Sequence, residues 1–218
     1  MEHAVSVTSG KPARRALNEE QRQAKLRVIL DAAFDVFVEK GFAEARLDDV
    51  AARAGVAKGT IYLYVPSKEA LFEALVRSTI STPLDAVEAD ITARDLPAET
   101  MLRLLFGWFR AEVLGTRKKE LVHLVISEAG RFPHLAEFYH REVVDRGMRV
   151  LRGVAHRAVA RGEFRSDELV RFPQLAIAPA MVALLWANLF SRIEPLDLDA
   201  MFEAHLALLM RALKGGGS

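Results

Sequence analysis

The sequence predicts an all-α protein in two parts, a small N-terminal domain followed by a larger helical domain. Apolar residues recur three or four positions apart over most of the 218-residue chain. No segment alternates with a period of two for long enough to indicate a strand, and glycine and proline separate the periodic segments. Hydrophobic residues make up 51% of the chain, so a sizeable core is available. We therefore expect about nine helices. The last two are expected over about residues 167–193 and 197–213, with Asp167 and Asp197 as candidate caps at their starts.

The composition excludes several kinds of chemistry. The chain has no cysteine, which excludes disulfides, thiolate catalysis and Cys-ligated zinc. Its net charge of +1 does not decide whether it binds DNA, because a DNA-binding surface needs local rather than total basic charge. The first residues lack the apolar core of a secretion signal, and the apolar run of residues 175–190 is shorter than the about 20 residues of a membrane span. We expect a cytoplasmic protein with no membrane partner.

The chain begins with a polar stretch and continues with an amphipathic helix. Residues 1–20 are small and polar and carry Lys11, Arg14 and Arg15, so we expect a disordered basic arm. This arm either touches DNA or has no role, and the residues leave both alternatives open. From about residue 21 to 40 the apolar positions follow one helical face, and Gly41 is expected to end that helix.

The most informative stretch is residues 47–68, LDDVAARAGVAKGTIYLYVPSK. Its first half has apolar residues at helical spacing, and Gly55 follows where a tight turn needs a left-handed backbone. A second short helix is expected from about residue 57 to 65, with Ile61 facing the first one. Pro66 ends it and Ser67 caps the next helix. Two short helices joined by such a turn form a helix-turn-helix, although a hairpin that merely packs is the alternative.

The polar residues of the second helix suit a role in DNA binding, because in a helix-turn-helix this helix enters the major groove. Their side chains can reach phosphates or base edges, and a glycine lets the backbone approach DNA closely. A cation at the start of the following helix can meet a phosphate there. The predicted DNA-binding residues are Arg46, Lys58, Gly59, Thr60, Tyr62, Tyr64 and Lys68.

At these positions the sequence resembles the TetR family of bacterial transcriptional repressors, over about residues 28–75. The matching positions are Ala33, Phe37, Gly41, Ala51, Gly55, Val56, Lys58, Gly59, Tyr62, Tyr64, Lys68 and Leu71. Three positions depart from the family pattern: Arg46 replaces a capping hydroxyl, Ala57 a frequent serine and Val65 a frequent phenylalanine. Arg46 can still reach a phosphate by its charge. The resemblance implies a helix-turn-helix domain over residues 21–66 and a one-component regulator, usually a repressor, that a small molecule releases from double-stranded operator DNA.

The remaining chain, residues 67–214, is expected to form the ligand-binding and dimerisation domain, with a flexible tail at residues 215–218. The run of residues 175–190 is apolar all round and must be buried. With the helix that follows, it forms either half of a homodimer interface, where the family places its dimer contact, or a purely intramolecular core. The predicted interface residues are Met181, Leu185, Phe202 and Leu209.

The middle helices combine aromatic side chains with a few polar groups, as a small-ligand pocket does, although a core with a wet edge has the same composition. The predicted ligand-binding residues are Trp108, Phe109, His123, Glu128, Arg131, Phe132, Phe138 and Tyr139. They suit an apolar or aromatic small-molecule effector, whose acidic group, if present, Arg131 or a histidine could hold. His134, Glu137 and His140 are spaced by three, whereas helical zinc sites use a four-residue step, so we expect no metal and no cofactor.

Two alternatives to this regulator stay open. A ligand-independent helix-turn-helix DNA-binding protein would be favoured by a fully packed C-terminal domain. An α-helical enzyme would need a convergent acid, base or nucleophile set, and the sequence shows none.

Overall fold

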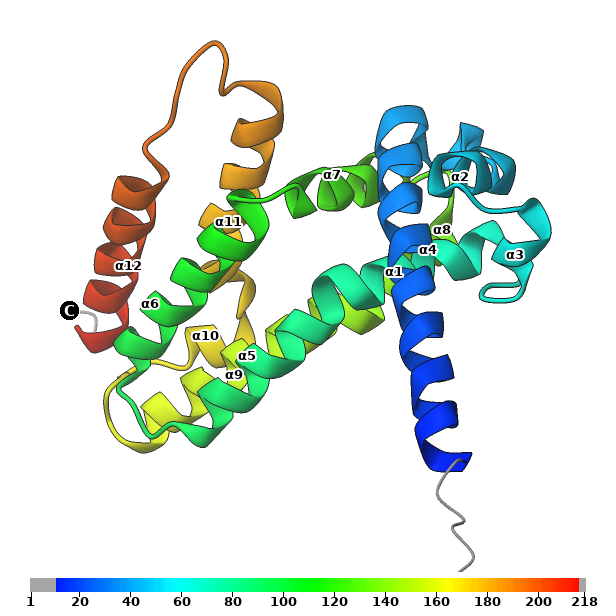
Figure 1. Cartoon of the computed structure of the whole chain (residues 1–218). Helices are drawn as coiled ribbons and strands as arrows, with labels where there is room; N and C mark the ends of the chain where they lie inside the picture. Colours follow the sequence, from blue (N-terminus) through cyan, green and yellow to red (C-terminus); the bar gives the residue numbers. More distant parts are fainter. Residues whose placement is uncertain (1–10, 216–218) are drawn as a thin grey trace, which may run out of the picture. The chain divides into compact units, whose positions relative to one another are not determined.

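The computed structural model describes residues 11–215, which form α-helices, three short π-helical segments and no strand, as the sequence predicts (Figure 1). The chain divides into two compact units between Leu75 and Val76. This division lies inside the helix α4 (Lys68–Val76), whereas the predicted boundary follows residue 66. The predicted tail lies outside the described residues except for its first glycine.

The N-terminal unit holds α1 (Lys11–Glu44), α2 (Leu47–Ala54), α3 (Lys58–Tyr62) and most of α4. Because α1 begins at Lys11, the prediction of a disordered arm was wrong for residues 11–20; residues 1–10 lie outside the described part of the chain. The stretch ARRALNEEQRQA is rich in strong helix formers. Pro12, which precedes it, is in the first turn of α1, where proline is tolerated. Near its other end α1 is interrupted at Gly41, whose φ of 75° and ψ of 165° are not helical.

Three phenylalanines form the centre of this unit. Phe37 and Phe42 stack with ring centroids 5.6 Å apart, and Phe72 meets them edge-on at 5.7 and 5.5 Å. All three are fully buried, as are Val50 of α2 and Ile61 of α3. The aromatic cluster thereby joins α1 to α4, while the aliphatic residues attach the two short helices to the same core.

The turns around α2 and α3 have the predicted chemistry. Gly55 takes the left-handed conformation (φ 64°, ψ 34°), and its N–H donates to carbonyl oxygens of the last turn of α2. The Ser67 hydroxyl accepts a 3.1 Å hydrogen bond from the Ala70 N–H and so caps α4. However, α3 ends at Tyr62 rather than near residue 65, because Pro66 disfavours a helical residue before it. After α3, the backbone N–H groups of Tyr64 and Val65 both donate hydrogen bonds to the Ile61 carbonyl oxygen.

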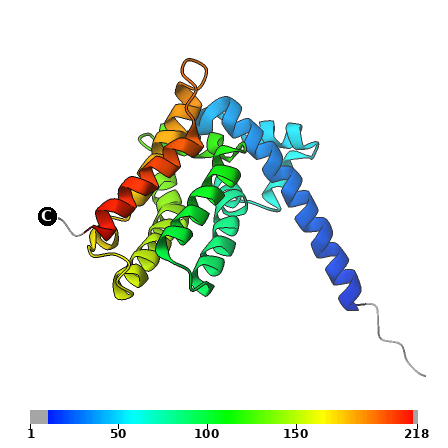
Figure 2. The ribbon, with the colours of Figure 1, turned by 90° about the vertical axis from the view of Figure 1, so that its left-hand side faces the viewer.

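The C-terminal unit is a helical bundle. In chain order its elements are η1 (Arg77–Ser81), α5 (Thr82–Ala93), α6 (Ala98–Phe109), η2 (Arg110–Leu114), α7 (Lys118–Glu128), α8 (Pro133–Tyr139), η3 (His140–Val144), α9 (Asp145–Ala160), α10 (Glu168–Arg171), α11 (Gln174–Leu189) and α12 (Leu198–Lys214). α9 packs against both α5 and α6, and α12 lies beside α6 and α11 (Figures 1 and 2). No helix within residues 11–215 has the length and apolarity to cross a membrane.

Two predicted helix starts have different outcomes. Asp197 caps α12 through a 3.0 Å hydrogen bond from the Ala200 N–H to its carboxylate. Asp167 precedes α10 without such a bond, so its predicted capping role was wrong. The single helix expected over about residues 167–193 is divided at Phe172 and Pro173, because proline lacks an N–H and restricts the residue before it.

Candidate DNA-binding surface and effector cavity

The helix α3 buries one side and exposes the other. Ile61 is inaccessible to solvent, whereas Lys58, Gly59 and Tyr62 are exposed and Thr60 and Tyr64 are half-buried. A Cβ atom placed on Gly59 would meet nothing within 4 Å, so this position is open towards solvent. Five of the predicted DNA-binding residues therefore lie on or directly after one short helix with a solvent-facing polar side. The adjoining Leu63 is 75% exposed and was missing from the prediction, which considered only polar groups.

Lys58 is held by a carboxylate of the preceding helix. Its Nζ lies 2.8 and 2.9 Å from the two carboxylate oxygens of Asp48. The hydrogen bond and the charge of Asp48 raise the pKa of Lys58. Both side chains are exposed, so the ammonium is oriented but remains accessible to another anion.

Lys68 has a different environment from the one predicted. Its Nζ donates to the carbonyl oxygens of Phe42 (2.7 Å) and Ala43 (3.0 Å) and lies 4.7 Å from the centroid of the Phe42 ring. A lysine that binds the carbonyls at a helix end stabilises that end. In this structure Lys68 thus fixes the end of α1 to the start of α4, which corrects the expectation that its ammonium is directed at a phosphate.

The other predicted residues frame α3. Arg46 is exposed and precedes α2, and its backbone N–H donates to the Asp49 carboxylate at 3.2 Å. The Arg22 guanidinium of α1 lies 5.7 Å from the centroid of the Tyr64 ring, a cation–π distance. Arg22 was not predicted; its sequence separation from α3 gives no signal of this contact.

Two ion pairs connect α1 with α2. The Arg53 guanidinium donates to both carboxylate oxygens of Glu39 at 2.6 and 2.7 Å. The Nζ atom of Lys40 lies 2.8 Å from a carboxylate oxygen of Asp49. The hydrogen bond from Arg53 lowers the pKa of Glu39, and the hydrogen bond from Lys40 lowers that of Asp49. These pairs orient the helix that supports α3 and leave the exposed side of α3 unoccupied by them.

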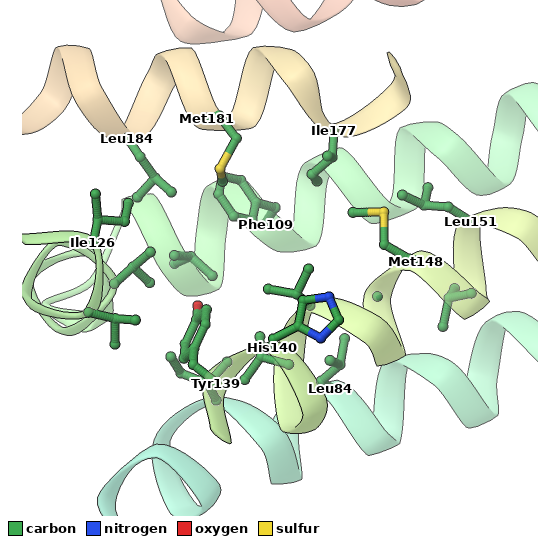
Figure 3. A pocket seen from close by; sticks show the side chains of 18 of the residues that line it. Leu84, Phe109, Ile126, Tyr139, His140, Met148, Leu151, Ile177, Met181 and Leu184 are labelled. Atoms are coloured by element: carbon green, nitrogen blue, oxygen red, sulfur yellow. The ribbon is translucent and has the colours of Figure 1, made fainter. Parts of the chain in front are cut away.

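The C-terminal unit contains a cavity of about 370 Å³, within the range of small-molecule sites (Figure 3). Three of the eight predicted ligand-binding residues line it: Trp108, Phe109 and Tyr139. The wall is mostly aliphatic and was largely missed. Its further residues are Ile80, Leu84, Leu105, Phe106, Val113, Val122, Val125, Ile126, Ala129, Ala136, His140, Val143, Val144, Gly147, Met148, Val150, Leu151, Ile177, Met181 and Leu184.

The other five predicted residues are absent from this wall. Phe138 is buried and has two guanidinium groups near its ring. The Cζ atoms of Arg77 and Arg141 lie 4.8 and 5.6 Å from the ring centroid. Arg131 is exposed and lies 4.0 Å from Glu128. The Phe132 ring lies near Arg131, at 5.7 Å, and His123 is half-buried elsewhere on α7.

Helical phase explains the error at Phe138. The lining residues of the segment from α8 to α9 recur at positions i, i+3, i+4, i+7, i+8 and i+11, which lie on one face of a helix. They are Ala136, Tyr139, His140, Val143, Val144 and Gly147. Phe138 precedes Tyr139 by one position, so it points about 100° away around the axis. This period was visible in the sequence, whereas the prediction selected residues by aromatic character.

Nitrogen or oxygen atoms are rare in the cavity wall. Only Trp108, Tyr139 and His140 carry them on their side chains, and no Asp, Glu, Lys or Arg lines the wall. Figure 3 shows the Tyr139 hydroxyl and the His140 ring pointing into the cavity. Burial raises the pKa of Tyr139, so its phenol remains a protonated hydrogen-bond donor at neutral pH. The cavity thus accepts an apolar body with few polar contacts.

All three π-helical segments contribute to the cavity wall. Ile80 belongs to η1, Val113 to η2, and His140 and Val143 to η3. A π-helical turn is rare in proteins, and where one occurs it is often at a functional site. The observation indicates that the cavity is a built feature of the bundle.

The helix α11 has two apolar faces. Ile177, Met181 and Leu184 line the cavity, whereas an exposed row lies beside them at three- and four-residue spacing. We call this row the α11 stripe; it consists of Leu175, Ala178, Val182, Leu185 and Leu189. Within a single chain the apolar run is therefore not buried all round, which disagrees with the alternative of a purely intramolecular core. An exposed apolar row of this kind indicates a contact with another molecule.

The four predicted interface residues have different environments. Met181 and Leu185 are exposed, at 41% and 46%, and Leu209 is half-buried. Phe202 is buried and stacks on Phe106 with centroids 5.4 Å apart. Phe202 thus belongs to the core of its own chain, which corrects its assignment to a surface.

Both units match models of known protein families. The family model of bacterial regulatory proteins of the tetR family matches residues 29–75, and the model of the tetracyclin repressor-like C-terminal domain matches residues 97–205. A fatty acid metabolism regulator protein from Bacillus subtilis is 33% identical over 90 residues, which are 41% of this chain and 46% of that protein. The HTH-type transcriptional regulator RutR of Escherichia coli is 40% identical over 93 residues, 41% of each chain. The matched part thus spans less than half the length of these relatives.

A solved structure extends the likeness to the fold of both units. The transcriptional regulator FadR from Bacillus subtilis, in complex with stearoyl-CoA, superposes with a TM-score of 0.66. The match covers 86% of this chain and 98% of FadR at 23% sequence identity.

Proposed function

The chain belongs to the TetR family of bacterial regulatory proteins, and we propose that it is a transcriptional repressor released from operator DNA by a small apolar effector. The observation that carries this proposal is the pairing of two features in one chain. One unit presents the polar side of a helix-turn-helix, and the other contains a cavity large enough for an organic ligand.

DNA binding is assigned to α3 and the residues around it. In a helix-turn-helix this second helix enters the major groove, and its exposed side chains contact bases and phosphates. Lys58 supplies a charge for the backbone, while Thr60, Tyr62 and Tyr64 supply hydroxyl groups. Because the operator would be read by two copies of this helix, we expect a near-palindrome with half-sites about 34–36 Å apart.

The second copy is assigned to the α11 stripe. Exposed apolar side chains on α11 lose contact with water when they pack against the same row of a partner chain, which gives a two-fold interface. Leu208 of α12, also exposed, extends this surface onto the neighbouring helix. Dimerisation is typical of the family and explains why a bacterial regulator of this size would expose such a row.

The effector is assigned to the cavity in the C-terminal unit. A cavity of about 370 Å³ is not what a fully packed, ligand-independent domain would contain. The relatives are transcriptional regulators, so they give no support to the enzyme alternative. Because one relative controls fatty acid metabolism and one structural neighbour holds stearoyl-CoA, acyl compounds are the first class to test.

The repressing and released states differ in their affinity for DNA and effector. If the effector binds better to the form that fits DNA poorly, it lowers DNA affinity, and DNA lowers effector affinity by the same factor. Typical coupling of about 1–3 kcal/mol corresponds to roughly 5–150-fold.

The test begins with selection of binding sites from random duplex DNA. Acyl, aliphatic and aromatic compounds are then titrated into the protein–operator complex, and DNA release is followed by fluorescence anisotropy. Trp108 lines the cavity, so its emission should change on binding of the same compounds. If a broad screen of these classes released no DNA, a ligand-independent DNA-binding protein would be the better interpretation.

A further inference from the structure

We infer that the uncharged wall of the cavity selects an effector whose buried part is uncharged over the corresponding free carboxylate, and that the Tyr139 hydroxyl donates to a carbonyl oxygen of this effector, as in an ester, thioester, amide or ketone. This inference rests on the proposed function only in taking the cavity of the C-terminal unit as the effector site. It adds the chemical class that the cavity accepts and the side chain that donates to the effector.

The first argument is the lack of charge in the wall. No acidic side chain, lysine or arginine lines the cavity. A carboxylate placed among aliphatic side chains would lose its hydration without gaining a fixed cation, which is strongly unfavourable. The nearest predicted partner for an acid, Arg131, is exposed and is not part of the wall. An uncharged acyl group avoids this cost.

The second argument is the state of Tyr139. Its ring belongs to the wall and its hydroxyl points into the cavity (Figure 3). The structure assigns this hydroxyl no hydrogen-bond partner among residues 11–215. This hydroxyl is therefore available to donate to a ligand or water in the cavity. A phenol that keeps its proton can donate a hydrogen bond to a neutral carbonyl oxygen.

His140 is the group that could change this choice. Its ring also points into the cavity, one helical position from Tyr139 (Figure 3). A protonated imidazole could pair with a carboxylate, whereas a neutral one can only add a second hydrogen bond. The test must therefore separate an effector bound through the phenol from an acid bound through His140.

The experiment uses methyl octanoate and octanoate, which share the acyl chain and differ in charge, with the full-length protein in the absence of DNA at pH 8. Calorimetry should show that the ester binds roughly tenfold or more tightly than the acid. Tyr139→Phe removes only the hydroxyl and should weaken ester binding by roughly 3–10-fold while changing octanoate binding little. The control is Ser191→Ala, which removes a hydroxyl from an exposed position outside the cavity wall and should leave both affinities unchanged.

A spectroscopic measurement keeps the inference testable if Tyr139→Phe does not fold. The carbonyl stretch of ¹³C-labelled methyl octanoate should move to lower frequency on binding to the wild type, because the oxygen accepts a hydrogen bond. An unshifted stretch, unchanged ester affinity in folded Tyr139→Phe, or no ester binding at its solubility limit would each overturn the inference. So would tighter binding of octanoate that is lost in His140→Gln.

Measuring binding without DNA separates the two proposals. If the ester binds through Tyr139 but does not release operator DNA, the proposed function fails and the assignment of Tyr139 stands. If other compounds release DNA through the cavity and the ester does not bind, the proposed function stands and the assignment of Tyr139 fails.

Discussion

The two units of this chain present their candidate sites in opposite ways. In the N-terminal unit most candidate DNA-binding residues are close together in sequence and lie at the surface, and Lys58 forms an ion pair with Asp48 of the preceding helix. In the C-terminal unit the cavity is assembled from six α-helices and three π-helical segments and is almost wholly apolar. A site of the first kind is specified by local order in the sequence. A site of the second kind exists only when distant helices pack.

The comparison predicts that loss of the N-terminal core leaves the cavity intact. Phe72→Ala removes one ring of the buried trio and should destabilise that unit by about 3–5 kcal/mol. Hydrogen exchange should then accelerate in α1 to α3 and remain slow in α6 and α9, with effector binding retained. Equal loss of protection in both units would show that they unfold as one.

A charge on the α11 stripe tests whether the second unit needs a partner chain. Leu185→Glu would bury an unpaired carboxylate in the proposed two-fold interface, which should weaken dimerisation by several kcal/mol at order-of-magnitude level. Sedimentation should show a monomer that retains its helical content. The control is Leu104→Glu, at a leucine of α6 that is exposed to a similar degree and lies outside the stripe. A wild type that sediments as a monomer at micromolar concentration would contradict the interface.

The two lysines of the helix-turn-helix should separate structure from DNA contact. Lys68→Met keeps the apolar stem but loses the hydrogen bonds to Phe42 and Ala43, so we expect about 1–2 kcal/mol less stability. Thermal unfolding of the protein without DNA measures this loss. At temperatures where the variant is folded, the salt dependence of its DNA binding should match that of the wild type.

Lys58→Ala should give the converse result. Its ammonium is exposed, so its loss should weaken binding to all sequences alike and reduce the slope of log K against log salt by about one unit. Stability should change little, since the pair with Asp48 is exposed. A reduced salt slope for Lys68→Met with no change for Lys58→Ala would reverse these two assignments.

The smallest expected effect is a pH dependence from the C-terminal unit. Burial lowers the pKa of His205, against a hydrogen bond to the backbone of Leu175 that raises it. The folded-state pKa is then below the unfolded value of about 6.5, so the unfolded chain takes up the proton first and stability falls as the pH drops below that value. His205→Gln should flatten the melting temperature between pH 7.5 and 5.5.

The lowered pKa values of Glu39 and Asp49 act in a separate and more acidic window. Their carboxylates stabilise the folded N-terminal unit above their ordinary pKa values of 4.5 and 3.8, and this contribution is lost as the pH falls through the lowered values. If the melting temperature of His205→Gln fell between pH 7.5 and 5.5 as steeply as that of the wild type, groups other than His205 would cause the pH dependence in this range.

Prediction from sequence succeeded where a signal was local. Gly55, Ser67 and Asp197 have the turn and cap roles expected, because each depends on a few neighbouring residues. The family match likewise confirms the resemblance that was based on residues 28–75. Most helix ends of the C-terminal unit also follow from glycine and proline positions.

Prediction failed where tertiary contacts decide. The carbonyls that bind Lys68 belong to a helix end that is distant in sequence, so its role could not be inferred from the motif. Phe202 was assigned to the dimer interface and Phe138 to the ligand pocket, but Phe202 packs against Phe106 and Phe138 packs between two arginines. The aliphatic cavity wall was missed because isoleucine, valine and leucine at helical spacing are the ordinary composition of a core.

The double use of α11 has a consequence for how such a protein can evolve. Met181 lines the cavity and is also 41% exposed next to the stripe, so one codon affects both ligand choice and a surface of the chain. Val122 of α7 lines the same cavity and is buried, so its replacement alters only the interior. Substitutions on α11 that change the ligand would therefore also change the exposed surface, whereas substitutions at Val122 of α7 would change the ligand site alone. A biosensor based on this protein is therefore best diversified first on α7.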